Sequence, residues 1–244
     1  EACLNQNAHK LRGILNGIDY GYYDPENDKA IFAAFTPARM AGKGKDKTAM
    51  QREVGLPERA DVPLLSIISR LASHKGLDIV SECIYSLVAQ NDVQLIILGK
   101  GEAKYEQLFI DLQASFPDKV RALITYDRDL SKRIYAATDI FLMPSKSEPC
   151  GLSQMICSRY GAVPIVRETG GLKDTITDSG DGKGNGFTFS EYNADAMAHA
   201  VYRAVQGYKN KEGWAILRRR AMECDNSWGA SANAYIKLYK SMMK

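Results

Sequence analysis

The sequence lacks any apolar run that approaches the roughly 20 residues a membrane span requires. Its N-terminus also lacks the basic-then-apolar pattern of a secretory signal. The five cysteines are odd in number and show no CxxC spacing, which predicts reduced thiols instead of a disulfide framework or a zinc site. We therefore expect a cytoplasmic protein that binds no membrane.

The sequence also lacks a strong excess of charge of one sign. It has 32 Lys and Arg residues and 29 Asp and Glu residues, which gives a formal net charge of +3. So small an excess favours anionic ligands only weakly and gives no support for nucleic-acid binding. The length of 244 residues and the 45% apolar content suit one large α/β domain with appendages, or two small ones. The chain opens without Met in a predicted helix at 1–10, so we expect it to be a piece of a longer protein.

Short apolar runs alternate with helical patterns from Pro63 onward. The runs consist mostly of Leu, Ile and Val, which is typical of strands buried on both faces, and they lie at 64–69, 93–98, 120–125, 139–143 and 162–166. Between them apolar residues recur at helical spacing, as in Leu77, Val80, Ile84 and Leu87. This alternation predicts an α/β fold with a doubly wound, parallel, Rossmann-like sheet. Ligands of such sheets lie beyond the carboxyl ends of the strands.

The flanking segments are predicted from composition and periodicity alone. The lysine-rich stretch 43–47 is expected to be a loop before a helix at about 48–54. Further helices are expected at 194–206, 212–222 and 228–242. Asn185, Gly186 and Phe187 are expected to form a structural turn.

Two cations follow the first predicted strand. Arg70 and Lys75 lie five positions apart, where a strand end leads into a helix. A helix N-terminus carries partial positive charge, and Arg and Lys can each hold phosphate oxygens, so the segment suits a diphosphate. A solvated basic loop is the alternative interpretation.

Glycines and a tyrosine follow the next two strands. Gly99 and Gly101 would let the backbone approach a ligand, although a plain turn explains them equally well. Tyr126 can stack on a nucleobase or simply pack. Asp127 and Asp129 form a DxD pattern, which we interpret as the N-terminal cap and first turn of a helix at 130–137 instead of a metal site.

The fourth strand leads into a loop that carries a carboxylate. Glu148 stands just before a glycine turn, and the backbone amides of Leu152 and Ser153 open a helix. The loop thus offers an acceptor for sugar hydroxyls and donors for a phosphate; a helix cap with an incidental Glu is the alternative. The fifth strand is followed by another flexible turn into a helix, Thr169-Gly170-Gly171.

Together these stretches resemble the C-terminal domain of bacterial glycogen synthases and plant starch synthases, the ADP-glucose enzymes of glycosyltransferase family 5. They occur in the family's order and spacing across nearly the whole chain. The matching stretches are Asn16-Gly17-Ile18-Asp19, Ser69-Arg70-Leu71 with Lys75-Gly76-Leu77-Asp78, Ser147-Glu148-Pro149-Cys150-Gly151-Leu152, Arg159-Tyr160-Gly161, Thr169-Gly170-Gly171-Leu172 and Asn185-Gly186-Phe187.

The resemblance implies the C-terminal half of a GT-B fold and a retaining transfer of glucose from ADP-glucose to the non-reducing end of an α-1,4-glucan. It implies that Arg70 and Lys75 neutralise the departing diphosphate and that Glu148 holds the donor glucose, with no metal or other cofactor. It implies further contacts to the nucleotide and phosphate from Gly99, Gly101, Tyr126, Cys150, Gly151, Leu152 and Ser153, and to the sugar from Thr169, Gly170 and Gly171.

The resemblance also implies a division of the chain. Residues 1–20 would be the end of a helix and an interdomain hinge, 21–225 the nucleotide-sugar-binding domain, and 226–244 a helix that crosses back to a missing N-terminal domain. The apolar side of that last helix would then be partly exposed; packing on its own domain is the alternative. A bacterial cytoplasmic protein is favoured over a plastid one.

Three departures from the family pattern qualify these expectations. Ser153 stands where the family commonly has Thr, and Ile156 where many GT-B enzymes have a second Glu for the ribose. Ribose recognition is then expected from elsewhere, such as the backbone near Gly99. The N-terminal domain is absent, so the isolated chain is expected to be inactive. The alternatives are a related retaining GT-B transferase with another donor or acceptor, or a nucleotide-binding module without activity.

Overall fold

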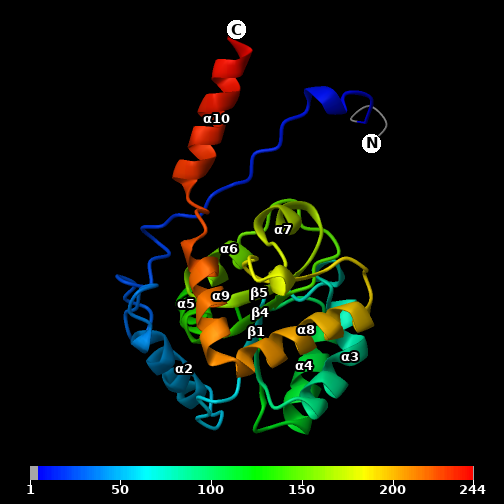
Figure 1. Ribbon diagram of the computed structural model, residues 1–244. Helices are drawn as coiled ribbons and strands as arrows, with labels where there is room; N and C mark the ends of the chain where they lie inside the picture. The colour runs from blue at the N-terminus through cyan, green and yellow to red at the C-terminus, as the bar shows by residue number, and fades with distance from the viewer. Residues whose placement is uncertain (1–4, 244) are drawn as a thin grey trace.

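Six parallel strands in the order β3-β2-β1-β4-β5-β6 form the centre of the structure, a computed structural model that describes residues 5–243 (Figure 1). The order departs from β1 in both directions, which is the doubly wound arrangement. Neighbouring strands are paired in parallel throughout. The strands are β1 Leu64–Ile68, β2 Gln94–Leu98, β3 Val120–Leu123, β4 Ile140–Met143, β5 Val163–Arg167 and β6 Phe187–Phe189.

The five predicted strands are confirmed within two residues at each end. The turn predicted at 185–187 is wrong in part, because Phe187 begins β6, which pairs with β5 in the register Ile165 to Phe187. A three-residue edge strand has too few positions to show a periodicity, and the Asn-Gly signal before it dominates the local pattern.

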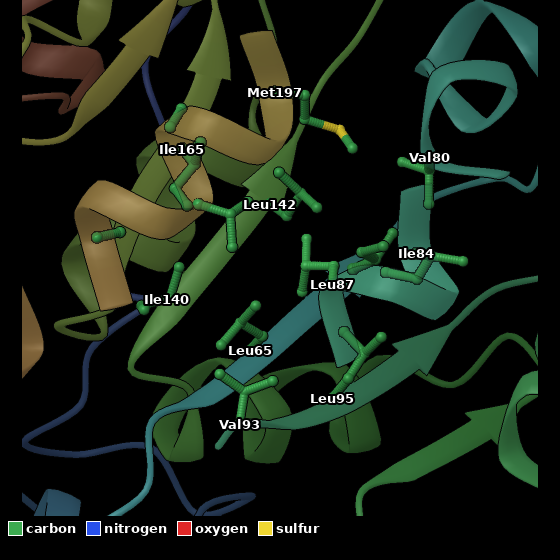
Figure 2. Packing of buried hydrophobic residues seen from close by; sticks show 14 of the residues in the cluster. Leu65, Val80, Ile84, Leu87, Val93, Leu95, Ile140, Leu142, Ile165 and Met197 are labelled. Carbon is green, nitrogen blue, oxygen red and sulfur yellow. The ribbon is translucent and has the colours of Figure 1, made fainter. Parts of the chain in front are cut away.

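Helices cover both faces of the sheet (Figure 1). One apolar cluster joins strand residues that point to the same face, such as Leu65, Ile140 and Ile165, to α3, α4, α8 and the start of α9. Figure 2 shows the centre of this cluster, where Ile84 and Leu87 of α3 face the strands. The bounds are α3 Leu77–Gln90, α4 Ala103–Ser115, α8 Ala194–Lys209 and α9 Lys211–Glu223.

The opposite face is covered by α2, α5 and α6. Strand residues that point the other way, such as Ile96 and Phe141, pack against these helices. Because the central strands are buried on both faces, their sequences are mostly apolar, and this made the sheet predictable from the sequence. The bounds are α2 Ala41–Glu53, α5 Arg128–Ala137 and α6 Ser153–Arg159.

The lysine-rich stretch 43–47 is not a loop but part of α2. Lys43 is 3% exposed and its Nζ donates to the carbonyl oxygens of Ala136 at 2.9 Å and Tyr160 at 2.7 Å. The Nζ of Lys47 lies 2.7 Å from Asp139 Oδ2 in a buried ion pair. These partners are distant in sequence. The local composition therefore predicts exposed lysines, although the folded chain buries them.

The remaining elements lie toward the ends of the chain. The helices expected at 194–206, 212–222 and 228–242 are confirmed as α8, α9 and α10, Trp228–Met242. Of the helix expected at 1–10, residues 1–4 lie outside the described residues, and the rest contains a short 3-10 helix, Ala8–Lys10. In Figure 1 α10 extends away from the sheet, and Trp228, Tyr235 and Tyr239 on it are exposed.

Across residues 5–243, no helix combines the length and the apolar character that crossing a bilayer requires.

Candidate functional site

A cavity of about 620 Å³ lies beyond the carboxyl ends of β1, β2 and β3, where ligands of doubly wound sheets bind. Four predicted site residues from separate loops line it together: Arg70, Gly99, Tyr126 and Ser153. Leu152 lines it as well. The fold therefore brings these distant stretches of sequence to one place. Tyr126 is 78% exposed, so its ring is available to a planar ligand.

Lys75 and Glu148 meet beside this cavity. The Nζ of Lys75 lies 2.6 Å from Glu148 Oε2, and the two side chains are 22% and 12% exposed. Gly76 makes this approach possible: it has φ of +80°, and a Cβ there would lie 2.1 Å from the carbonyl oxygen of Pro144. Because only glycine fits, the turn after β1 can pack directly on the end of β4.

A second, smaller cavity of about 180 Å³ adjoins the first. Arg70 and Ser153 line both, and Lys75 lines the smaller one. Arg70 is exposed, with its Nη2 3.3 Å from His74 Nε2. Arg70 thus stands where the two cavities meet and Lys75 lines the smaller one, an arrangement that can hold an anion.

Gly170 and Gly171 support the Glu148 loop from behind, and they line neither cavity. The backbone N–H of Gly171 donates to the carbonyl oxygen of Glu148 at 3.1 Å. A Cβ would lie 2.2 Å from that oxygen at Gly170 and 2.1 Å from the Cys150 carbonyl oxygen at Gly171. These glycines therefore fix the position of the carboxylate loop, and Thr169 is the residue that precedes them at the start of α7, Gly170–Thr175.

Gly101, Cys150 and Gly151 also lie outside both cavities. The backbone of Gly101 pairs with Leu71, and a Cβ there would lie 2.0 Å from the Leu71 carbonyl oxygen. Gly151 has φ of +73°, a conformation that favours glycine. Cys150 is half-buried against the apolar cluster under α6. In this structure the three residues shape the loops instead of facing the cavities.

Asp127 caps α5, as the sequence predicted. Its side chain accepts a hydrogen bond from the backbone N–H of Leu130 at 2.8 Å. Ile156 lines the larger cavity, so an apolar side chain occupies the place noted for a ribose-binding Glu.

Sequence reasoning missed one wall of the larger cavity, which Tyr22, Tyr23 and Lys132 form. The Nζ of Lys132 lies 3.7 Å from the centre of the Tyr22 ring and 3.2 Å from Asp28 Oδ2. The tyrosines within 20–23 could have indicated a binding wall in the sequence. Their contact with Lys132 of α5 could not be predicted, because the two segments are distant in sequence.

Arg167, at the end of β5, was missed as well. Its Nε donates to the carbonyl oxygen of Ser145 at 3.1 Å, and its Nη2 donates to that of Lys146. Its guanidinium also lies 5.3 Å from the ring centre of Tyr192, whose hydroxyl donates to Asp78 at 2.5 Å. This network ties the loop before Glu148 to the helix that follows Lys75.

Comparisons with known proteins agree with this geometry. Residues 49–217 match the family described as Glycosyl transferases group 1. The chain is 46% identical to the glycogen synthase of Bacillus licheniformis, over 100% of the chain and 51% of that protein. It is also 46% identical to the glycogen synthase of Thermosipho africanus, over 50% of that protein. The chain thus spans about half the length of the curated relatives it matches.

Among solved structures, the catalytic domain of Starch Synthase IV from Arabidopsis thaliana bound to ADP and acarbose superposes with a TM-score of 0.90 at 38% identity. The match covers 98% of this chain and 50% of that one. Sucrose-phosphate synthase from Thermosynechococcus elongatus shares the fold, with a TM-score of 0.67 at 19% identity. These likenesses confirm the predicted Rossmann-like half of a GT-B fold.

Proposed function

Because the chain belongs to the group 1 glycosyl transferases, we propose that it is the donor-binding half of a glycogen (starch) synthase. The proposed reaction transfers glucose from ADP-glucose to the non-reducing end of an α-1,4-glucan, with retention of the α configuration. The relatives named glycogen synthase and the ADP-bound starch synthase support this choice. The observation that carries it is the Lys75–Glu148 pair, 2.6 Å apart, in which Lys75 lines the smaller cavity that adjoins the nucleotide-sized one, and Glu148 lines neither.

The proposed mechanism is electrostatic. Tyr126 stacks on the adenine, Arg70 and Lys75 hold the diphosphate, and Glu148 accepts hydrogen bonds from the glucose hydroxyls. The bond between C1 and the phosphate oxygen breaks and its electron pair leaves with ADP, while a hydroxyl oxygen of the glucan forms the new bond to C1 and its proton passes to the released phosphate. The two cations stabilise the charge that develops there, which is the usual role of preorganised positive groups in transfer reactions.

No metal or other cofactor enters the proposal, because the two cations already compensate the leaving group. Asp127, which a DxD metal site would need, uses its side chain to cap α5. ADP-glucose is thus a substrate and ADP a product.

The glucan and the remaining donor contacts belong, in this proposal, to an N-terminal domain. The chain matches only about half of each relative, which leaves room for such a domain. Domain closure would then exclude water and limit hydrolysis of the donor. The chain alone is expected to bind ADP without transferring glucose. The identity is higher to the bacterial relatives than to the plant one, 46% against 38%, which supports a bacterial enzyme over a plastid one.

A donor panel tests the proposal. Calorimetry on this chain should give tighter binding of ADP than of UDP or GDP. The complete enzyme should incorporate labelled glucose into glycogen from ADP-glucose in preference to UDP-glucose or GDP-glucose. A preference for another donor would favour a related retaining transferase, and transfer by this chain alone would contradict the need for a second domain.

A further inference from the structure

The loops after β1 and β2 pair with each other beyond the ends of their strands. The backbone N–H of Leu71 donates to the carbonyl oxygen of Lys100 at 2.9 Å, and that of Glu102 donates to the carbonyl oxygen of Leu71 at 2.7 Å. Gly101 has no room for a side chain here, because a Cβ would lie 2.0 Å from the Leu71 carbonyl oxygen. The backbone of Glu102 is therefore held beside the turn that carries Lys75.

The side chain of Glu102 caps that turn. The turn is a short 3-10 helix, Ser73–Lys75, and Ala72 at its N-cap position makes no side-chain hydrogen bond to it. Glu102 Oε1 accepts a hydrogen bond from the backbone N–H of Ser73 at 2.9 Å, which satisfies a donor that a helix N-terminus leaves free. Glu102 also precedes α4, but its side chain makes no capping hydrogen bond to that helix. The carboxylate thus holds the turn after β1 and not its own helix.

Neighbouring polar groups hold the Glu102 carboxylate in this position. Lys104 Nζ lies 3.2 Å from Glu102 Oε2, and the Ser73 hydroxyl lies 3.3 Å from the same oxygen. The Ser73 hydroxyl is itself 2.9 Å from the hydroxyl of the buried Tyr105. The pKa of Glu102 lies below its ordinary value, mainly because the backbone N–H of Ser73 stabilises the carboxylate. The group is therefore ionised at neutral pH.

The turn that Glu102 caps makes two contacts with the Glu148 loop. The carbonyl oxygen of His74 accepts a hydrogen bond from the backbone N–H of Lys146 at 3.0 Å. One residue later, the Nζ of Lys75 lies 2.6 Å from Glu148 Oε2. Glu102 lines neither cavity, so its effect on these groups passes through the turn. A shift of the turn would displace the ammonium of Lys75 and the Glu148 loop together.

We propose that Glu102 is a positioning residue of the transfer reaction: by binding the Ser73 N–H, it fixes the turn that presents Lys75 to the leaving group. The inference rests on the proposed function, because it assigns Lys75 a part in that reaction. Placement matters for the rate, since a misplacement of about 1 Å can cost about 10²-fold. Glu102 thus contributes to transfer without touching the donor.

Initial rates of glucose transfer by the complete enzyme test the inference. Glu102→Ala removes the acceptor of the Ser73 N–H and is expected to lower kcat by about tenfold to 10²-fold, with a smaller change in KM for ADP-glucose. Glu102→Gln should recover most of the rate, because its amide oxygen still accepts a hydrogen bond. Glu106→Ala is the matched control and should leave kcat unchanged. Glu106 also accepts from a backbone N–H, that of Gly101 at 2.8 Å, but this bond holds its own loop and not the turn.

A double-mutant cycle with Lys75→Ala separates positioning from a structural role. If Glu102 acts through Lys75, Glu102→Ala should have little further effect on kcat once Lys75→Ala is present. Full additivity of the two losses in kcat would overturn the inference, and so would a lower melting temperature with an unchanged kcat. If Glu102→Ala fails to fold, as judged by circular dichroism, Glu102→Leu replaces it in the cycle, since leucine fills a similar space and accepts no hydrogen bond.

Other outcomes separate this inference from the proposed function. If the parent enzyme transfers glucose from ADP-glucose and Lys75→Ala slows the transfer but Glu102→Ala does not, the inference alone fails. If the parent enzyme transfers no glucose from ADP-glucose, the proposed function fails and the inference fails with it.

Discussion

Lys75 Nζ lies 2.6 Å from Glu148 Oε2 and thereby joins the turn after β1 to the loop after β4. These strands are neighbours in the sheet, with Leu65 paired to Ile140. Each side chain is mostly buried, so each neutralises a charge that would otherwise be poorly solvated. The phosphate end and the sugar end of the proposed donor site are therefore mechanically and electrostatically linked before any donor binds.

Replacing Lys75 tests the leaving-group role. Lys75→Ala in the complete enzyme should lower kcat by about 10²–10³, the usual effect of removing one preorganised group that stabilises transition-state charge. The measurement is the initial rate of glucose transfer from ADP-glucose to glycogen. Arg219→Ala is the control, since Arg219 is 62% exposed and pairs with Glu223 one turn away on α9. Near-normal transfer by Lys75→Ala would rule out the assignment.

Arg167 offers a test of positioning. Its guanidinium donates to two carbonyl oxygens just before Glu148, so Arg167→Ala should let that loop move. We expect a lower kcat with a nearly unchanged KM for ADP-glucose and an unchanged melting temperature. Arg167→Lys should recover only part of the rate, because an ammonium cannot reproduce the two-pronged geometry of arginine. A loss confined to thermal stability would instead mean that Arg167 is merely structural.

The sheet was predictable because its signal is local. All five residues of β2 are buried, and the apolar character of 95–98 follows from burial on both faces. The edge strand β6 was missed because three residues carry no period and an Asn-Gly pair precedes them. Ligands of doubly wound sheets lie beyond the strand ends, so Arg70, Lys75 and Glu148 could be proposed from the sequence alone.

The rest of the site depends on partners that are distant in sequence. Arg167 attracted no attention, because a guanidinium that holds two backbone carbonyls has no sequence pattern. The lysines of α2 were assigned to a solvated loop for the same reason. Lys47 finds its counterion in Asp139, and Lys43 its acceptors at the ends of α5 and α6, only once the fold has formed.

The buried pair Lys47–Asp139 predicts a large stability effect. Lys47→Met should destabilise the chain by about 3–5 kcal/mol, because it leaves the buried Asp139 carboxylate without its counterion. Urea unfolding measures this loss. The exposed pair Arg52–Glu58 is the comparison, with side chains 69% and 43% exposed, and Arg52→Ala should have a much smaller effect because water screens the pair. Equal losses from the two variants would argue against a buried ion pair.

Lys43 predicts a pH dependence of stability. Burial lowers the pKa of Lys43 to about 7 from its ordinary value of 10.5. Between pH 7 and about 9 the unfolded chain then binds more protons than the folded one, so the free energy of unfolding should rise with pH, by up to about 1.4 kcal/mol per unit. The window ends near 9 because burial raises the pKa of the Cys157 thiol, which has the opposite effect.

Urea unfolding at pH 7 and pH 9 checks this expectation. Lys43→Met should abolish the rise, whatever its effect on stability at pH 7, because it removes the titrating group. Parallel stability profiles for the parent and Lys43→Met would show that another group controls this range.

Two glycines of α2 predict opposite effects of the same substitution. Gly44 is exposed in the helix and a Cβ there would meet nothing within 4 Å, so Gly44→Ala should stabilise the chain by roughly 0.5–1 kcal/mol. Gly42 is buried, and a Cβ there would lie 2.2 Å from the carbonyl oxygen of Ala34, so Gly42→Ala should destabilise it. Urea unfolding of both variants measures the two changes. If 43–47 were a solvated loop, neither helix propensity nor close packing would apply, and both substitutions would be nearly neutral.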